Sequence, residues 1–181
     1  MAGVDMAIVR RALHGFVLLS VMMVATPALA QIQRYGDFYY FEGSDAFSDE
    51  SRSFVFTMPM GSNSEGVLVW KCLEDGLNVL YGFGKYLGGD SDNEVLVRFR
   101  IDKRAPVERR YWKLTSGSDD VNGRYAFMPL EDVARFTSAA LSGSKVAVEV
   151  VDPLDGEVLR HEFSLRGLTL ALQRLECSKR W

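Results

Sequence analysis

The two cysteines of this chain are the first residues whose chemistry can be weighed. Cys72 lies in the central segment VLVWKCLEDG and Cys177 in the terminal segment LQRLECSKRW. A reactive thiol, a metal ligand and half of a disulfide are the roles open to each. No histidine lies near either cysteine, which speaks against a metal site. Two lone cysteines in an oxidising compartment most often pair, so we predict a Cys72–Cys177 disulfide.

The first thirty residues indicate such a compartment. Arg10 and Arg11 precede the apolar run FVLLSVMMVA, which leads to TPALA and then Gln31. A basic flank, a short apolar core and an Ala-x-Ala ending are typical of a secretory signal peptide. The run is too short for a typical membrane-spanning helix, and no second one follows. We therefore predict a signal peptide over 1–30, cleaved after Ala30, and a single periplasmic domain over 31–181 without a membrane span.

A row of charged residues offers a second kind of chemistry. The segment EVLVRFRID alternates apolar residues with Arg98, Arg100 and Asp102, and Trp112 follows in YWKL. Arginine and tryptophan are common anchors of interfaces, so we predict a binding face made of Arg98, Arg100, Asp102 and Trp112, with Arg109 and Arg110 nearby. The alternative is a solvated side of a sheet, with Arg100 and Asp102 as an intrastrand or loop-tethering pair.

Other residues give little support to catalysis or metal binding. His161, the one histidine after residue 30, alternates with apolar residues, so we expect a core histidine rather than a base. No Gly-x-Ser-x-Gly segment is present, and a histidine-based metal cluster would need a second histidine. We expect no catalytic residue, no metal and no cofactor. Paired carboxylates such as Asp49 and Glu50 leave a wall-degrading hydrolase as the rival interpretation.

The rest of the chain predicts strands. In GVLVWKCLEDGLNVLYGFG, two apolar runs flank Asp75-Gly76, which favours a two-residue type I′ turn and sets Cys72 opposite Val79. In a second hairpin, SKVAVEVV and GEVLRHEFSL place Val148 and His161 on one face and Glu149 and Arg160 on the other. Five more strands are expected in the segments GDFYYFEG, SRSFVFTMP, EVLVRFRID, VERRYWKLT and GRYAFMP.

Two segments have helical periodicity instead. PLEDVARFTSAALSG places Leu130 and Val133 at helical spacing, and GLTLALQRLEC repeats apolar residues from Leu168. The second helix should stop near Leu175 so that Cys177 can fold back onto Cys72. The sequence thus predicts a mainly β domain: an antiparallel β-sandwich or open barrel with two short helices and one disulfide.

The order of several segments resembles a known family. WKCLEDGLNVLYGFGKYL, VRFRID, YWKL and FSLRGLTLALQRLECSKRW succeed one another as in the VasI/TagO-like accessory proteins of bacterial type VI secretion. The resemblance spans residues 67–181. It implies a small exported domain with paired cysteines at Cys72 and Cys177, with Arg100 and Asp102 in an Arg-x-Asp strand. It also implies a noncatalytic role.

These observations lead to one functional expectation and two rivals. We expect a noncatalytic cell-envelope module that binds another envelope protein or cell-wall peptidoglycan, with accessory service to type VI secretion as an extension. The rivals are the carboxylate hydrolase and a periplasmic enzyme inhibitor that inserts loop 88–94. A formal net charge of −3 without a long basic run argues against a nucleic-acid partner.

Overall fold

The structure, a computed structural model, describes residues 31–43, 52–61, 65–88, 93–115 and 123–178. The predicted signal peptide over 1–30 lies outside the described residues. The described chain contains one antiparallel sheet of ten strands, two α-helices and one 3-10 helix. The strands are β1 (Gln31–Tyr35), β2 (Phe38–Glu42), β3 (Phe54–Thr57), β4 (Val67–Leu73), β5 (Gly76–Gly82), β6 (Glu94–Ile101), β7 (Arg110–Leu114), β8 (Tyr125–Phe127), β9 (Lys145–Val151) and β10 (Val158–Ser164). The helices are α1 (Leu130–Leu141), α2 (Leu168–Leu172) and the 3-10 helix η1 (Glu176–Ser178).

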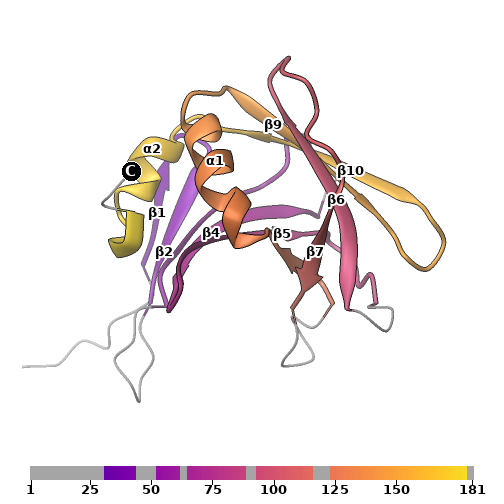
Figure 1. The fold of residues 1–181 in the computed structure, drawn as a ribbon. Helices are drawn as coiled ribbons and strands as arrows, with labels where there is room; N and C mark the ends of the chain where they lie inside the picture. Colours follow the sequence, from indigo (N-terminus) through magenta and orange to yellow (C-terminus); the bar gives the residue numbers. More distant parts are fainter. Residues whose placement is uncertain (1–30, 44–51, 62–64, 89–92, 116–122, 179–181) are drawn as a thin grey trace, which may run out of the picture.

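The ten strands lie in the order β1-β2-β3-β4-β5-β8-β7-β6-β9-β10. The sheet bends strongly, and α1 and α2 lie against its concave side (Figure 1). It is not closed into a barrel, although Pro59 bridges to Phe163 and the Met60 N–H donates to the Glu162 carbonyl at 2.7 Å. That short contact covers part of the outer edge of β10. The predicted mainly β, antiparallel fold with two helices is confirmed.

The β4–β5 hairpin turns one residue earlier than predicted. Leu73 pairs with Gly76, so the turn residues are Glu74 and Asp75 rather than Asp75 and Gly76. A type I′ turn needs a positive φ at both central residues. Of these residues only Gly76 has a positive φ, 115°, and Gly76 lies after the turn. The glycine is therefore the first residue after the turn, where its positive φ starts β5, and it is not one of the two turn residues.

This correction changes the partners in the hairpin but not its faces. Cys72 pairs with Leu77 and not with Val79, and Trp70 pairs with Val79. The register differs from the predicted one by two residues, and side chains alternate with a period of two. Trp70 and Val79 therefore face the core as predicted, and both are fully buried.

Strands β6, β9 and β10 alternate as predicted and form the end of the sheet that carries the charged residues. In β6 the side chains of Val95, Val97, Phe99 and Ile101 are buried. Glu149 pairs with Arg160 across β9 and β10, so the two share a face of this hairpin as predicted. Because β6 also pairs with β9, the outward side chains of three strands lie in rows.

Helix α1 fills the concave side of the sheet through aromatic contacts. The ring of Phe136 stacks on Trp70 at 5.8 Å between centroids and meets Phe99 edge-on at 4.8 Å. The Trp70 indole N–H donates to the Thr137 hydroxyl at 3.2 Å, so its polar atom is satisfied within the core. The predicted helix is confirmed, but Leu130 is 49% exposed. The stripe that faces the sheet consists of Val133, Phe136, Thr137 and Ala140.

A disulfide joins the C-terminal end of the described chain to β4. Cys72 and Cys177 are bonded with their Cα atoms 5.8 Å apart, which confirms the predicted pair. Helix α2 ends at Leu172, and η1 then brings Cys177 back to β4, where its N–H donates to the Cys72 sulfur. A disulfide indicates an oxidising, exported compartment. Neither α-helix in the described part of the chain is long and apolar enough to cross a membrane.

Replacing both cysteines with alanine should destabilise the protein by about 2–4 kcal/mol, because the link closes a long loop in the unfolded chain. Urea unfolding followed by tryptophan fluorescence would measure the loss. The Ser138→Ala variant, which alters an exposed side chain of α1, serves as a control. Equal unfolding midpoints for the oxidised parent and the double variant would show that the disulfide contributes nothing to stability.

Candidate functional site

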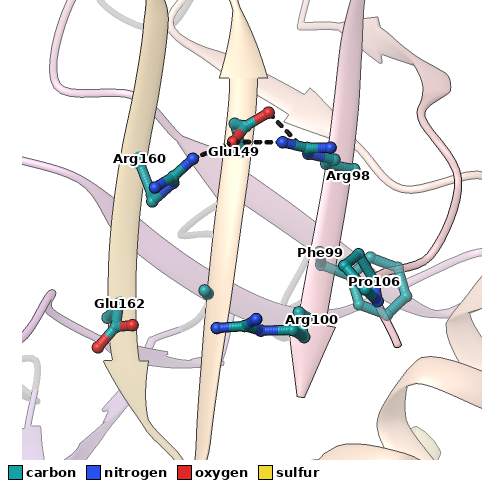
Figure 2. A pocket seen from close by; sticks show the side chains of 8 residues that line it. Arg98, Phe99, Arg100, Pro106, Glu149, Arg160 and Glu162 are labelled. Atoms are coloured by element: carbon teal, nitrogen blue, oxygen red, sulfur yellow. Dashed lines mark hydrogen bonds and ion pairs between the residues drawn. The ribbon is translucent and has the colours of Figure 1, made fainter. Parts of the chain in front are cut away.

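The outward side chains of β6, β9 and β10 form two charged rows on the convex side of the sheet (Figure 2). In the first row, Glu149 of β9 lies between Arg98 of β6 and Arg160 of β10. In the second row, Ala147 lies between Arg100 and Glu162. We call this surface the arginine face and define it as Arg98, Arg100, Arg109 and Arg160 with the residues between them.

Glu149 is the organising residue of the first row. Its carboxylate accepts two hydrogen bonds from Arg98, at 2.7 and 3.0 Å, and one from Arg160 at 2.7 Å. A further hydrogen bond comes from Arg109, which reaches in from the β6–β7 connection at 2.8 Å. The carboxylate is only 5% exposed. Three arginines are thus held around one buried acid.

The protonation state of Glu149 follows from this environment. Burial of the carboxylate raises its pKa, but the hydrogen bonds from the three arginines outweigh burial and lower the pKa of Glu149 to about 2. The residue therefore stays ionised at neutral pH. An ionised carboxylate bound by three guanidinium groups is a poor proton donor or acceptor, and its role is to position those groups.

The second row contains an open hollow. A pocket of about 200 Å³ lies over Ala147, beside Arg100 and Pro106 and next to Glu149. Ala147 lies between Arg100 and Glu162, and its small side chain leaves room between these two, which are seen apart in Figure 2. Glu162 is bound by Lys145 at 3.0 Å. Arg100 has no hydrogen bond or ion pair with any residue of the described chain, and it is exposed.

The charges of the arginine face do not cancel. The four arginines have one acid, Glu149, to balance their charge, because the charge of Glu162 is already balanced by Lys145. The surplus is three positive charges. Guanidinium groups bind carboxylate and phosphate oxygens in pairs of parallel hydrogen bonds, so the face suits an oxyanion ligand.

The structure brings together only part of the predicted binding set. Arg98 and Arg100 lie side by side on the convex face. Asp102 instead has a positive φ of 51°, and its carboxylate accepts hydrogen bonds from the N–H groups of Ser144 and Lys145. Asp102 therefore tethers a loop, as one alternative from the sequence proposed, but it does so without the expected partner Arg100. Trp112 is 2% exposed and pairs with Val95 on the concave side, so it cannot contact a ligand on the arginine face.

The site also uses residues that the sequence prediction did not include. Glu149 and Arg160 were recognisable as neighbours from the β9–β10 register alone. Arg109 was expected near the binding face, but its contact with Glu149 had no such signal, because it lies in an irregular connection whose path depends on tertiary packing. The neighbouring Arg110 binds Asp132 of α1 at 3.1 Å and belongs to a different cluster.

His161 is partly buried beside the core. Its Nδ1 lies 2.5 Å from the hydroxyl oxygen of Tyr81, a fully buried residue of β5. Burial lowers the pKa of His161, so the neutral imidazole is favoured. Gly66 packs so closely on the imidazole that a β-carbon there would lie 2.6 Å from Nδ1.

One group of acids has the spacing of a metal site. Asp152, Asp155 and Glu157 place three carboxylate oxygens within 4.8 Å of one another at the β9–β10 turn. The ammonium of Lys85 lies 2.8 Å from Asp152 and 3.0 Å from Glu157. Hydrogen bonds to these two acids raise the pKa of Lys85, which keeps its charge. The lysine thus supplies the positive charge that a cation would bring.

No protein-family model matches the chain, and no curated protein matches it in sequence. Among solved structures it is similar to the crystal structure of invasion associated protein B from Bartonella henselae. The TM-score is 0.57, the sequence identity is 13%, and the match covers 80% of this chain and 94% of the other. At this identity the likeness concerns the fold alone. None of these comparisons supports the VasI/TagO resemblance, which stays a prediction.

Replacing Glu149 with glutamine should lower the free energy of unfolding by roughly 3 kcal/mol at neutral pH, since it leaves three clustered arginines without their counter-charge. Urea unfolding of the variant and the parent would measure this loss. The matched control is Glu74→Gln in the exposed β4–β5 turn, which should stay close to the parent.

The difference in unfolding free energy between the parent and Glu149→Gln should become smaller as the pH falls. The pKa of Glu149 is about 2 in the folded chain and 4.5 in its ordinary state, so its stabilising effect is complete above about pH 4.5. It is lost as the pH falls from there toward 2. The unfolding curves of parent and Glu149→Gln should therefore converge on acidification. A constant difference between pH 7 and pH 3 would contradict this account of the network.

Proposed function

We propose that this chain is a noncatalytic module of the cell envelope that binds an acidic partner through the arginine face. The observation that supports this most strongly is Arg100, an exposed arginine without a partner in the described chain, beside a hollow over Ala147. An isolated arginine on a sheet is ordinary. An arginine beside three others, with room for a ligand between them, favours oxyanion binding.

The geometry around Glu149 favours binding because it is organised in advance. Arg98 is held by two hydrogen bonds and Arg160 by one, so each guanidinium keeps further N–H groups for a ligand. Side chains that are already ordered lose less conformational entropy on binding. The buried acid thus fixes the donors, and Arg100 supplies an uncommitted charge.

The proposed location is the periplasm. The disulfide indicates an oxidising compartment, and the N-terminal segment has the pattern of a secretory signal peptide. Among envelope components, peptidoglycan carries carboxylates on its peptides, and it is the partner we favour. An acidic envelope protein is the second candidate.

The VasI/TagO resemblance would add an accessory role in type VI secretion to this binding function. It depends on the order of short segments between residues 67 and 181. The name of the structural neighbour associates that protein with invasion. A role in invasion is not transferred to this chain, because the two proteins share only their fold.

The rival functions receive less support from the site. A carboxylate hydrolase needs one acid that is protonated at working pH. The acids named for it, Asp49 and Glu50, lie outside the described residues. In the hollow, Glu149 is held ionised by arginines and Glu162 is bound by Lys145. The inhibitor hypothesis depends on loop 88–94, of which residues 89–92 lie outside the described residues. It stays a prediction.

The test is co-sedimentation of the purified chain with isolated peptidoglycan sacculi. Arg100→Glu should weaken binding by about tenfold or more, since it replaces a charge-assisted contact with repulsion. Arg124→Glu is the matched control, because it makes the same charge change at an exposed arginine just before β8. The chain should no longer co-sediment with sacculi whose carboxylates have been converted to amides.

Two results would contradict parts of this proposal. Equal retention of Arg100→Glu and the parent would exclude the arginine face as the binding site. Failure of the parent to bind sacculi would exclude peptidoglycan and leave an acidic envelope protein. Photo-crosslinking in periplasmic extracts from a residue introduced at position 162 would then show whether a protein occupies the hollow.

A further inference from the structure

A second, apolar pocket lies between α1 and the β6–β7 connection. Its volume is about 200 Å³, and its surface is mostly apolar. The lining residues are Phe99, Ile101, Arg104, Ala105, Val107, Arg135, Phe136 and Ala139. The side chains of Phe99 and Ile101 point to the concave side of the sheet. This pocket, which we call the slot, therefore lies on the opposite side of β6 from the arginine face.

The walls of the slot are held in place by contacts within the fold. The Val107 N–H donates to the Phe99 carbonyl at 2.9 Å, which keeps the β6–β7 connection alongside β6. Phe136 of α1 meets Phe99 edge-on and closes the base. Ala105 and Ala139 face the slot with methyl groups only, and this leaves a narrow space between the two walls.

Polar contacts mark the two ends. At one end the Arg104 guanidinium donates to the Ser142 hydroxyl at 3.2 Å. At the other, Asp132 accepts from Arg135 at 2.8 Å and from Arg110 at 3.1 Å.

The charges at the ends differ. Arg135 has its counter-charge in Asp132, whereas Arg104 has only the neutral hydroxyl of Ser142 and no carboxylate partner in the described chain. An apolar slot with one uncompensated cation at its mouth suits an amphipathic anion. The volume is below the 300–1,000 Å³ of typical drug-sized sites, which favours a single thin chain over a ring system.

We propose that this slot binds a medium-chain aliphatic carboxylate, such as a fatty-acid anion, with the chain along Phe99 and Phe136 and the carboxylate on Arg104. The site is independent of the arginine face and of the function proposed for it. Binding needs no covalent step. Octanoate is a suitable probe because it combines a linear chain with one carboxylate.

Isothermal titration of the purified chain with octanoate tests the proposal. Affinity should rise about fourfold for each methylene added from hexanoate to octanoate, because each added group leaves water. Arg104→Ala should weaken octanoate binding by about tenfold and leave binding of the uncharged octanol unchanged. Arg124→Ala, at an exposed arginine just before β8 that lines neither pocket, should leave octanoate binding unaltered.

A filled slot provides the second variant. Ala139→Leu keeps a good helix former in α1 and places a branched side chain in the slot, so it should abolish binding of both octanoate and octanol. Its melting temperature would confirm that the variant is folded. No saturable binding of octanoate to the parent, or octanoate binding that survives Ala139→Leu, would overturn the proposal. Equal loss of octanoate and octanol in Arg104→Ala would overturn the role given to the charge.

Discussion

The stacking of Trp70 on Phe136 is the contact on which this fold depends. A single curved sheet has a concave side that a second layer must cover, and a chain of this size has little material for one. Helix α1 supplies that layer and anchors itself by ring stacking and by the hydrogen bond from the Trp70 indole to Thr137. Helix α2 and the disulfide complete the cover at the end of the sheet that contains β1, β2 and β4.

Within the described residues, no helix or strand covers the convex side of β6, β9 and β10, and this side carries the charges. Glu149 is the unusual member of this side, because an outward acid of a sheet is normally exposed and this one is buried by the arginines around it. A buried charge is tolerated only with complete pairing. The same pairing orders the arginines that we propose bind an oxyanion, so stability and binding have a common origin here.

Much of this arrangement was predictable from local patterns, and the failures have physical causes. Alternation with a period of two placed Arg98, Arg100 and Glu149 on one side of the sheet. The turn at Asp75-Gly76 was predicted wrongly because the glycine takes its positive φ one position after the turn. Trp112 was placed on the wrong side although β7 carries a local signal for it. Trp112 and Leu114 are buried while Tyr111 and Lys113 are exposed, and the prediction did not use this alternation.

Strand β6 supplies both proposed sites from alternate residues, with Arg98 and Arg100 on one side and Phe99 and Ile101 on the other. A slip of one residue would exchange the two sets and destroy both sites. Asp102 prevents such a slip, because its carboxylate holds two N–H groups at the start of β9 and its own N–H donates to Lys145. The residue that the sequence suggested as part of a binding face is thus better understood as the one that fixes the register of both.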